Sequence, residues 1–216
     1  FSQLIDHGQR SLGTFSQRYI TNEYYYRQGG PIILYINGED ELNYWAIEGQ
    51  VADLAQATGG LLVALEHRYF GQSLPFSEFT TKNMQYLTTD QALKDLARFI
   101  QSFKGTSKAQ INPSSRWIVV GGSYAGNLAA WMRLTYPDLV FAAYSSSAPV
   151  KAKLDFFEYD MAVHDGLPSV CASALSNATI HMDTILMSNT IASQKAKETL
   201  KARFGLEAVK DDVSFA

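Results

Sequence analysis

The residues of this chain whose types and spacing could do chemistry centre on Ser123, in the stretch WIVVGGSYAGNLAAW (117–131). An apolar run leads into two glycines and the serine, and a stretch typical of a helix follows at once. At such a strand-to-helix corner, large side chains two residues before and after the serine would collide with the neighbouring elements, but Gly121 and Ala125 are small. The pattern therefore indicates an exposed serine hydroxyl that attacks a carbonyl carbon.

The same corner offers groups that could stabilise the negative charge formed in such an attack. The helix after Ser123 points its first amides and the positive end of its dipole at an oxyanion, and the backbone N–H of Tyr124 is one expected donor. A second donor is expected from the loop INGEDE (36–41), where Gly38 allows close approach and the N–H of Glu39 is the candidate. Simple glycine turns at both places stay open as alternatives. A phosphate-binding loop is disfavoured because no lysine follows the serine.

A serine nucleophile needs a general base, and the sequence offers no obvious one. In enzymes with this type of corner, the acid and the histidine follow the serine along the chain. Only His164 and His181 do so, and both fall in helix-like stretches that favour surface or capping roles. His67 precedes the serine and is interpreted as structural or as part of a pocket wall. We therefore expect a nucleophile without its base, which suggests that the chain stops short of the complete site.

Apolar segments that alternate with helical patterns must form the framework that positions these residues. Strands are expected at 31–36, 61–67, 117–120 and 140–147, and helices at 43–60, 88–103 and 127–136. Strands that are apolar throughout and alternate with helices predict an α/β fold, with a mainly parallel sheet and helices on both faces. An antiparallel edge strand or hairpin is expected within 14–26, and Thr88 with Gln91 fits a capping box. The segments that follow the four strands should gather at one edge of the sheet.

The character of the sequence changes after Pro149. The remaining residues read as helices with polar breaks, and no strand alternation is evident. The predicted domains are therefore 1–150, which holds the strands and the serine, and 151–216, the beginning of a helical insertion or cap.

The overall composition limits the classes of function. Of the 216 residues, 46% are hydrophobic and 18% are charged, which is typical of a globular protein, and the net charge of −3 argues against nucleic acid binding. No apolar run approaches about 18 residues, so no membrane span is expected. No cofactor or metal is predicted, and the oligomeric state is not indicated. Asn177 lies in a glycosylation triplet, and the lone Cys171 in a secreted protein would hint at a partner outside the chain.

Several ordered motifs resemble one family of serine peptidases. The stretches LEHRYFGQSLPF, YLTTDQALKDLARFI, GGSYAGNLAAWMRLTYPDLV and SSSAPV look like lysosomal prolylcarboxypeptidase, the related lysosomal dipeptidyl peptidase and fungal acid prolyl endopeptidases. FSQLIDHGQRSLGTFSQRY and KARFGLEAV look closest to the fungal branch. The resemblance implies an α/β-hydrolase domain interrupted by a helical domain, with the acid and histidine of the triad beyond that insertion. It also implies that Ser123 is the nucleophile, that the Tyr124 amide helps form the oxyanion hole, and that Glu39 matches an acidic residue of the early loop.

The first hypothesis is a serine peptidase that cleaves bonds next to proline through an acyl-enzyme on Ser123. The resemblance implies proline-containing peptides as substrates, and a secreted, lysosomal or vacuolar location. Tyr69 and Phe70 are candidate walls of an aromatic proline pocket, whereas ordinary core packing is favoured for Trp131. The alternatives are another α/β-hydrolase such as an esterase, and a truncated piece without turnover.

Overall fold

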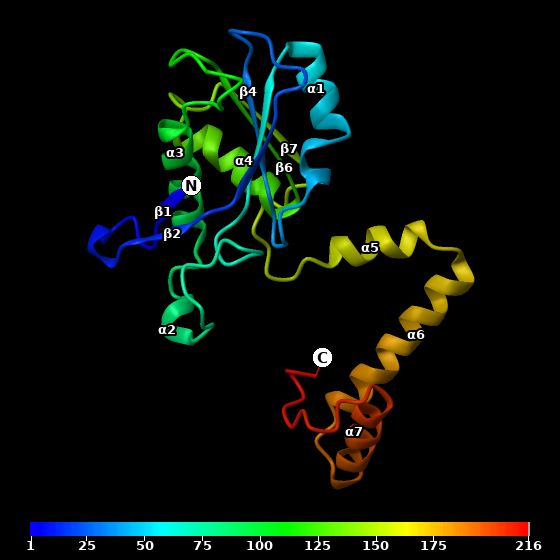
Figure 1. The fold of residues 1–216 in the computed structure, drawn as a ribbon. Helices are drawn as coiled ribbons and strands as arrows, with labels where there is room; N and C mark the ends of the chain where they lie inside the picture. The colour runs from blue at the N-terminus through cyan, green and yellow to red at the C-terminus, as the bar shows by residue number, and fades with distance from the viewer. Residues whose placement is uncertain (216) are drawn as a thin grey trace. The chain divides into compact units, whose positions relative to one another are not determined.

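The computed structural model describes residues 1–215, which form two compact units that divide between Ala152 and Lys153. The first unit holds all strands of the described chain, and the second holds three helices (Figure 1). The division between residues 152 and 153 lies two residues after the boundary expected from the sequence, between 150 and 151.

A five-stranded sheet forms the centre of the first unit. Its spatial order is β3 (Tyr19–Asn22), β5 (Leu61–Leu65), β4 (Ile32–Ile36), β6 (Trp117–Gly122) and β7 (Ala142–Ser146). β3 runs antiparallel to β5, and the other neighbours are parallel. The predicted mainly parallel sheet is therefore confirmed, and β3 is the expected antiparallel edge strand.

Three strands end elsewhere than the apolar pattern predicts, although β7 ends only one residue early, at Ser146. β5 ends at Leu65, two residues before the expected end, and the carboxylate of Glu66, the next residue, accepts hydrogen bonds from loop residues. β6 continues to Gly122 because the two glycines pair with Ser145 and Ser146 of β7. The added residues carry the serine corner to the carboxyl end of the sheet.

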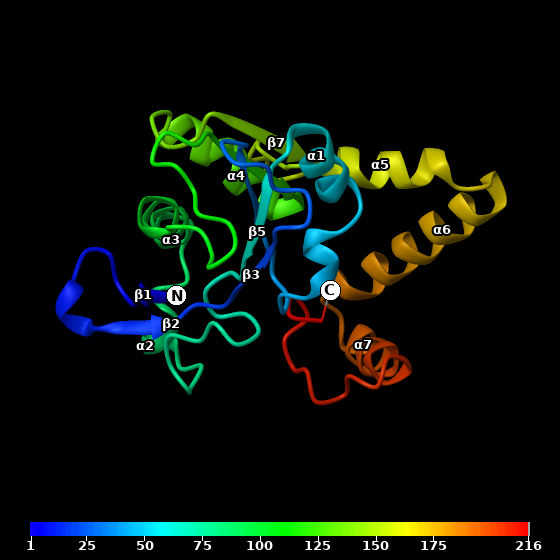
Figure 2. The ribbon, with the colours of Figure 1, turned by 45° about the horizontal axis from the view of Figure 1, so that its top comes forward.

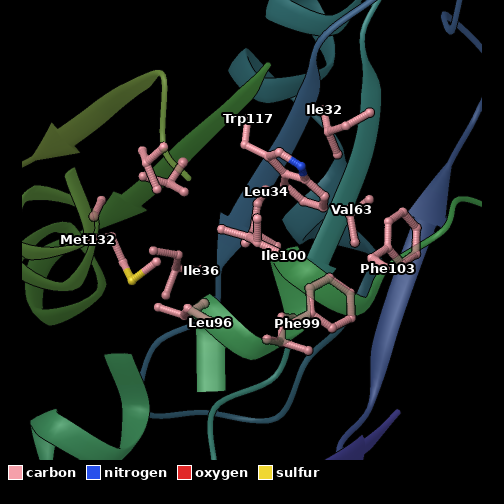
Figure 3. Packing of buried hydrophobic residues seen from close by; sticks show 14 of the residues in the cluster. Ile32, Leu34, Ile36, Val63, Leu96, Phe99, Ile100, Phe103, Trp117 and Met132 are labelled. Atoms are coloured by element: carbon pink, nitrogen blue, oxygen red, sulfur yellow. The ribbon is translucent and has the colours of Figure 1, made fainter. Parts of the chain in front are cut away.

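Helices α3 (Thr89–Ser102) and α4 (Ser123–Thr135) cover one face of the sheet (Figures 1 and 2). Their apolar sides pack on alternate strand residues, as Figure 3 shows for Ile32, Leu34, Ile36, Val63, Leu96, Phe99, Ile100, Phe103, Trp117 and Met132. The Thr88 side chain accepts a hydrogen bond of 3.3 Å from the Gln91 N–H. The Gln91 side chain instead contacts Asp6 and the His7 N–H, so only half of the expected capping box forms.

The opposite face of the sheet is covered by a 3₁₀ helix, η2 (Tyr44–Ile47), and by α1 (Gln50–Thr58) (Figure 2). These elements pack on strand residues such as Ile33 and Leu62, which point away from the first layer. The single helix expected over 43–60 is wrong, because the chain breaks at Gly49, whose φ is 59°.

The N-terminal segment is fastened to this framework by a buried ion pair. β1 (Ser2–Leu4) and β2 (Thr14–Ser16) form a separate two-stranded sheet, joined by the short helix η1 (Arg10–Leu12). The fully buried Arg68 guanidinium donates to both Asp95 carboxylate oxygens at 2.6 and 2.7 Å, and to the Ile5 carbonyl at 3.1 Å. The residues after β5 are thereby held against α3.

The second unit consists of α5 (Phe157–Gly166), α6 (Ser169–Leu186) and α7 (Ile191–Arg203). Thr190 and Ser193 form a capping box at the start of α7. Lys197 and Lys201 each lie 2.8 Å from an oxygen of Asp212, which ties the tail of the chain to α7. A further short helix, α2 (Thr81–Met84), belongs to the first unit, and no helix in residues 1–215 is long and apolar enough to cross a membrane.

Candidate active site

Ser123 lies at the corner between β6 and α4 and is exposed to solvent. Its φ is 55°, in the left-handed region that non-glycine residues rarely adopt. Such a conformation costs about 1–3 kcal/mol and persists only where the surroundings fix it. The strained corner predicted from the sequence is thus present, and the serine hydroxyl is not packed inside.

The small residues around the corner have a direct steric reason. A Cβ atom on Gly121 would lie 2.1 Å from the Ala125 carbonyl oxygen, and one on Gly126 would lie 2.8 Å from the Ser146 carbonyl oxygen. A Cβ on Gly122, by contrast, would meet no atom within 4 Å. The corner therefore requires glycine at 121 and 126, and it accommodates the buried methyl group of Ala125.

Tyr124 is the second residue of α4, and its ring contacts a residue that follows β5. The ring is half-buried, and burial raises the pKa of its hydroxyl. The hydroxyl oxygen lies 3.1 Å from Nε2 of His67, and the two ring centroids are 5.5 Å apart. The backbone N–H of Tyr124 is in the first turn of α4, where amides lack partners within the helix.

His67 is buried, and its neighbours determine which ring nitrogen carries a hydrogen. Nδ1 lies 2.8 Å from the Arg68 carbonyl oxygen, which only accepts hydrogen bonds. In the neutral ring, Nδ1 therefore carries the hydrogen, and Nε2 accepts from the Tyr124 hydroxyl. Burial lowers the pKa of His67 below its ordinary value. The sequence placed His67 as structural or as a pocket wall and missed this contact; only its position at the carboxyl end of a strand hinted at it.

Glu39 lies in the loop after β4, where the sequence expects the second oxyanion donor. The residue is exposed, and the charge of its carboxylate acts on both neighbouring rings. It adds to the effect of burial in raising the pKa of Tyr124, and it opposes the effect of burial on the pKa of His67. The structure brings His67 and Tyr124 into contact, and Glu39 lies near enough for its charge to act on both rings.

A buried carboxylate holds the two loops of this site in place. Glu66 is fully buried and accepts hydrogen bonds from the Leu42 N–H at 2.8 Å and the Ser73 hydroxyl at 2.6 Å. The Gln72 N–H donates at 3.0 Å to Oε2, the same oxygen that the Ser73 hydroxyl contacts. The loop after β4 and the loop after β5 are therefore joined through one side chain, which makes the surroundings of Glu39 and His67 rigid.

The two candidate pocket aromatics lie in different surroundings. Tyr69 is 5% exposed, its φ is 70°, and its hydroxyl donates to the Asn83 carbonyl, so it fastens α2 to this loop. Phe70 is half-buried, and its ring meets the His67 ring edge-on at a centroid distance of 5.5 Å. Phe70 thus borders the site, whereas Tyr69 offers little free surface. Trp131 packs against the buried cluster of Figure 3, in keeping with its interpretation as core.

A groove of about 690 Å³ borders the other side of the corner. It lies over the sheet face next to η2 and α1, and its lining is mostly apolar. Gly121 and Gly122 form one wall, and the aromatic rings of Trp45 and Tyr144 contribute others. Trp45 is 79% exposed, so part of the wall of the groove is an aromatic ring open to solvent.

The remaining candidate residues lie on helices of the second unit. His164 on α5 and His181 on α6 are exposed, and Nδ1 of His164 lies 3.2 Å from Asp165. Asn177 and Cys171 are exposed on α6, and Cys171 is a free thiol. Within residues 1–215, no group of three or more histidine, cysteine or acidic side chains could hold a metal ion.

The sheet order and the corner define an α/β-hydrolase. A solved structure with the same fold is the proline iminopeptidase of Mycobacterium smegmatis, with a TM-score of 0.59 and 18% identity over 92% of this chain and 60% of that chain. The predicted fold class is thereby confirmed.

Comparison of the amino-acid sequence with family models identifies the family of this chain. The family model described as serine carboxypeptidase S28 matches residues 3–215, and the chain belongs to this family. It is 38% identical to the serine protease vicPa of Bipolaris victoriae (strain FI3), over 96% of this chain and 40% of that protein. It is 39% identical to the lysosomal Pro-X carboxypeptidase of Pongo abelii, over 69% of this chain and 31% of that protein. The chain spans about two fifths of the length of the first such relatives.

Proposed function

We propose that this chain supplies the nucleophile and the oxyanion hole of a serine peptidase that cleaves peptide bonds next to proline. The observation that carries the proposal is the exposed Ser123 at a positive φ on the corner before α4, in a chain of the serine carboxypeptidase S28 family. The family supports serine peptidase chemistry, and the corner supports Ser123 as the group that performs it.

In the proposed reaction, a general base takes the proton from the Ser123 Oγ as that oxygen bonds to the carbonyl carbon of the substrate. The negative charge moves to the carbonyl oxygen, where the N–H groups of Tyr124 and Glu39 would donate to it. The C–N bond then breaks, and the leaving amine takes the proton from the base. Water, deprotonated by the same base, attacks the acyl-enzyme and releases Ser123 with its proton restored.

The general base is not one of the two histidines of the first unit. His7 contacts Asp95 at 2.7 Å, and both ring nitrogens of His67 have partners other than Ser123. Relatives extend well beyond the matched region, and the order serine, acid, histidine places the remaining triad residues after Ser123. We therefore assign the base to the protein beyond the first unit.

Specificity for proline rests on the names of similar proteins and on the groove. One relative is called a Pro-X carboxypeptidase, and one structural neighbour is called a proline iminopeptidase. A proline ring is compact and apolar and has no N–H to satisfy, which suits the aromatic walls beside the corner, with Phe70 on one side and Trp45 on the other.

A secreted or lysosomal location is proposed on similar grounds. Relatives include a probable extracellular serine carboxypeptidase of Arthroderma benhamiae and the lysosomal enzyme named above. The exposed Asn177 on α6 would accept a glycan in such a compartment.

The test compares substrates in the longest reading frame that contains this chain. A peptide cleaved after proline, the same peptide with alanine in place of proline, and a short-chain ester are each offered to the wild type and to Ser123→Ala. We expect turnover of the proline peptide that Ser123→Ala reduces by at least about a thousandfold. Turnover of the ester alone would favour an esterase, and equal turnover by Ser123→Ala would overturn the proposal.

A further inference from the structure

The end of β7 and the loop after it, residues 145–149, form a strap that lies against the start of α4. The strap and the helix meet most closely at Gly126. A Cβ atom on this glycine would lie 2.8 Å from the Ser146 carbonyl oxygen and 3.0 Å from Cβ of Ala148. The proposed reaction uses no group of the strap, so the chemistry by itself does not account for this close fit against the helix of the nucleophile.

We propose that Ser145 and Asn127 are positioning residues that tie the strap to α4 and thereby hold the strained backbone of Ser123 in its reactive geometry. The inference rests on the proposed function, because it concerns how the nucleophile and the amide of Tyr124 are kept in place. Both residues act through the backbone of the corner and touch no reacting atom.

Ser145 connects the two arms of the corner. In the parallel pairing of β6 with β7, it lies opposite Gly121, two residues before the serine nucleophile. Its hydroxyl donates a hydrogen bond of 2.8 Å to the Gly126 carbonyl oxygen, three residues after that serine. One residue is therefore paired with the strand arm through its backbone and with the helix arm through its side chain, which restricts the angle at which the helix leaves the strand.

A second tie lies further along the strap. The chain turns at Ser147, whose φ of 49° persists only where neighbouring contacts fix it. The Pro149 carbonyl oxygen then accepts a hydrogen bond of 3.3 Å from Nδ2 of Asn127. Asn127 is 7% exposed and comes four residues after Ser123, so the two residues are neighbours on the same face of the helix. The strap is therefore fastened to the face of α4 that bears the nucleophile.

The two ties act on the part of α4 where the reaction needs accuracy. Ser123 is exposed, and its positive φ is kept only by what surrounds it. Its Oγ and the N–H of Tyr124 must face the same carbonyl group, and a displacement of about 1 Å can lower the rate about a hundredfold. Met132 and its neighbours pack the far part of α4 on the sheet, whereas the ties reach residues 126 and 127 beside the corner. Loss of a tie therefore disturbs the serine more than it disturbs the fold.

Two variants of Ser145 isolate its hydroxyl. Ser145→Ala removes the hydrogen bond to Gly126 but leaves that carbonyl with the donor that an α-helix supplies four residues on. The variant should therefore fold with little loss of stability. Ser145→Thr restores a hydroxyl on a residue type that suits a strand, and it serves as the conservative rescue. Ser147→Ala is the matched control, because it removes an exposed hydroxyl from the strap and takes part in neither tie.

Asn127→Leu separates position from stability. Leucine has nearly the shape of asparagine, so the packing is kept while the hydrogen bond to Pro149 is lost. The substitution also removes Oδ1, a buried oxygen that has no hydrogen-bond partner within residues 1–215. These two changes have opposite effects on stability, so the unfolding temperature should stay close to that of the wild type. A residue with a purely structural role would then leave kcat unchanged as well.

The functional measurement is kcat and KM for the proline peptide in the longest reading frame that contains this chain, with the unfolding temperature as the control for folding. We expect Ser145→Ala and Asn127→Leu each to lower kcat about tenfold at unchanged KM, as the loss of one hydrogen bond predicts. Ser145→Thr should keep kcat within about threefold of the wild type, and Ser147→Ala should match it. A wild-type kcat in both Ser145→Ala and Asn127→Leu would overturn the inference while the proposed function stands. So would losses of kcat that simply follow the unfolding temperature.

A second measurement does not depend on turnover. Hydrogen exchange followed by mass spectrometry compares peptides that cover residues 123–131 with peptides that cover β4, which report global opening. We expect Ser145→Ala and Asn127→Leu to speed exchange at the start of α4 by about tenfold and to leave β4 unchanged. No change at α4, or equal acceleration in both regions, would overturn the inference by itself. Absence of any Ser123-dependent turnover in the wild type would overturn the proposed function, and the positioning role with it.

Discussion

The two units of the chain bury apolar side chains to very different extents. In the first unit, both faces of the sheet carry closed clusters whose members, such as Leu34 and Phe99, are fully buried. In the second unit, Ala172 and Leu200 are the buried apolar residues among the side chains described, while Leu154, Val170 and Met187 are largely exposed. Helices of similar length are therefore packed on an extensive hydrophobic core in the first unit, whereas those of the second unit bury few apolar side chains.

This difference in burial indicates which part of the chain fixes the backbone position of Ser123. Short helices gain most of their stability from packing, not from their own hydrogen bonds. α4 begins at Ser123 and is packed by Leu128 and Met132 against the sheet, so the strained corner is fixed by a core that the first unit supplies itself. The helices of the second unit instead leave many large apolar side chains exposed, among them Val163, Leu175 and Ile180.

The largest effect is expected from emptying the core of the first unit. Phe99→Ala should lower the free energy of unfolding by about 3–5 kcal/mol, because the ring is fully buried among Phe1, Tyr19 and Phe103. The matched Leu175→Ala in α6 should change it by less than about 1 kcal/mol, because that side chain is 56% exposed. Urea denaturation followed by circular dichroism measures both. Equal losses would show that the two units do not differ as described.

The next effect concerns the corner itself. Gly121→Ala should cost about 3 kcal/mol, because the new methyl group would lie 2.1 Å from a backbone oxygen that has no flexible end to move. Gly122→Ala should cost less than about 1 kcal/mol, because the residue has an extended φ of −117° and open space around its Cβ. The same denaturation experiment compares them. A corner that tolerates both substitutions equally would not be held by the packing of α4 on β6.

The smallest effect is the pH dependence that comes from His67. Because burial lowers its pKa in the folded state, the unfolded chain binds more protons between the folded pKa and 6.5. The contribution of this residue is therefore fully present above 6.5 and is lost as the pH falls through the folded pKa. The free energy of unfolding of His67→Gln should fall less steeply than that of the wild type in this window, as a pH series of urea midpoints would measure. Parallel curves would contradict the assignment of a buried neutral imidazole.

Much of the fold could be predicted because the relevant signals are local. The apolar run at 31–36 and the glycines before Ser123 specify a buried strand and a sharp corner from neighbouring residues alone. The break at Gly49 was missed because the apolar spacing continues across it, although the backbone there has positive φ.

The contacts that complete the candidate site were not predictable in this way. Gln91 bonds to Asp6, which lies 85 residues away, and His67 contacts Tyr124 across 57 residues. Such pairs depend on the three-dimensional course of the loops at the end of the sheet, and residue spacing carries no signal of them. The carboxyl-end rule indicates the edge where they meet but not which side chains touch.

The central claim is that Ser123 is the nucleophile, and covalent labelling tests it most directly. The longest reading frame that contains this chain is treated with a fluorophosphonate, and the modified peptide is located by mass spectrometry. We predict one adduct, on Ser123, which is absent from Ser123→Ala and reduced by prior incubation with a proline peptide. An adduct on another residue, or none in a folded protein that still cleaves the peptide, would contradict the account.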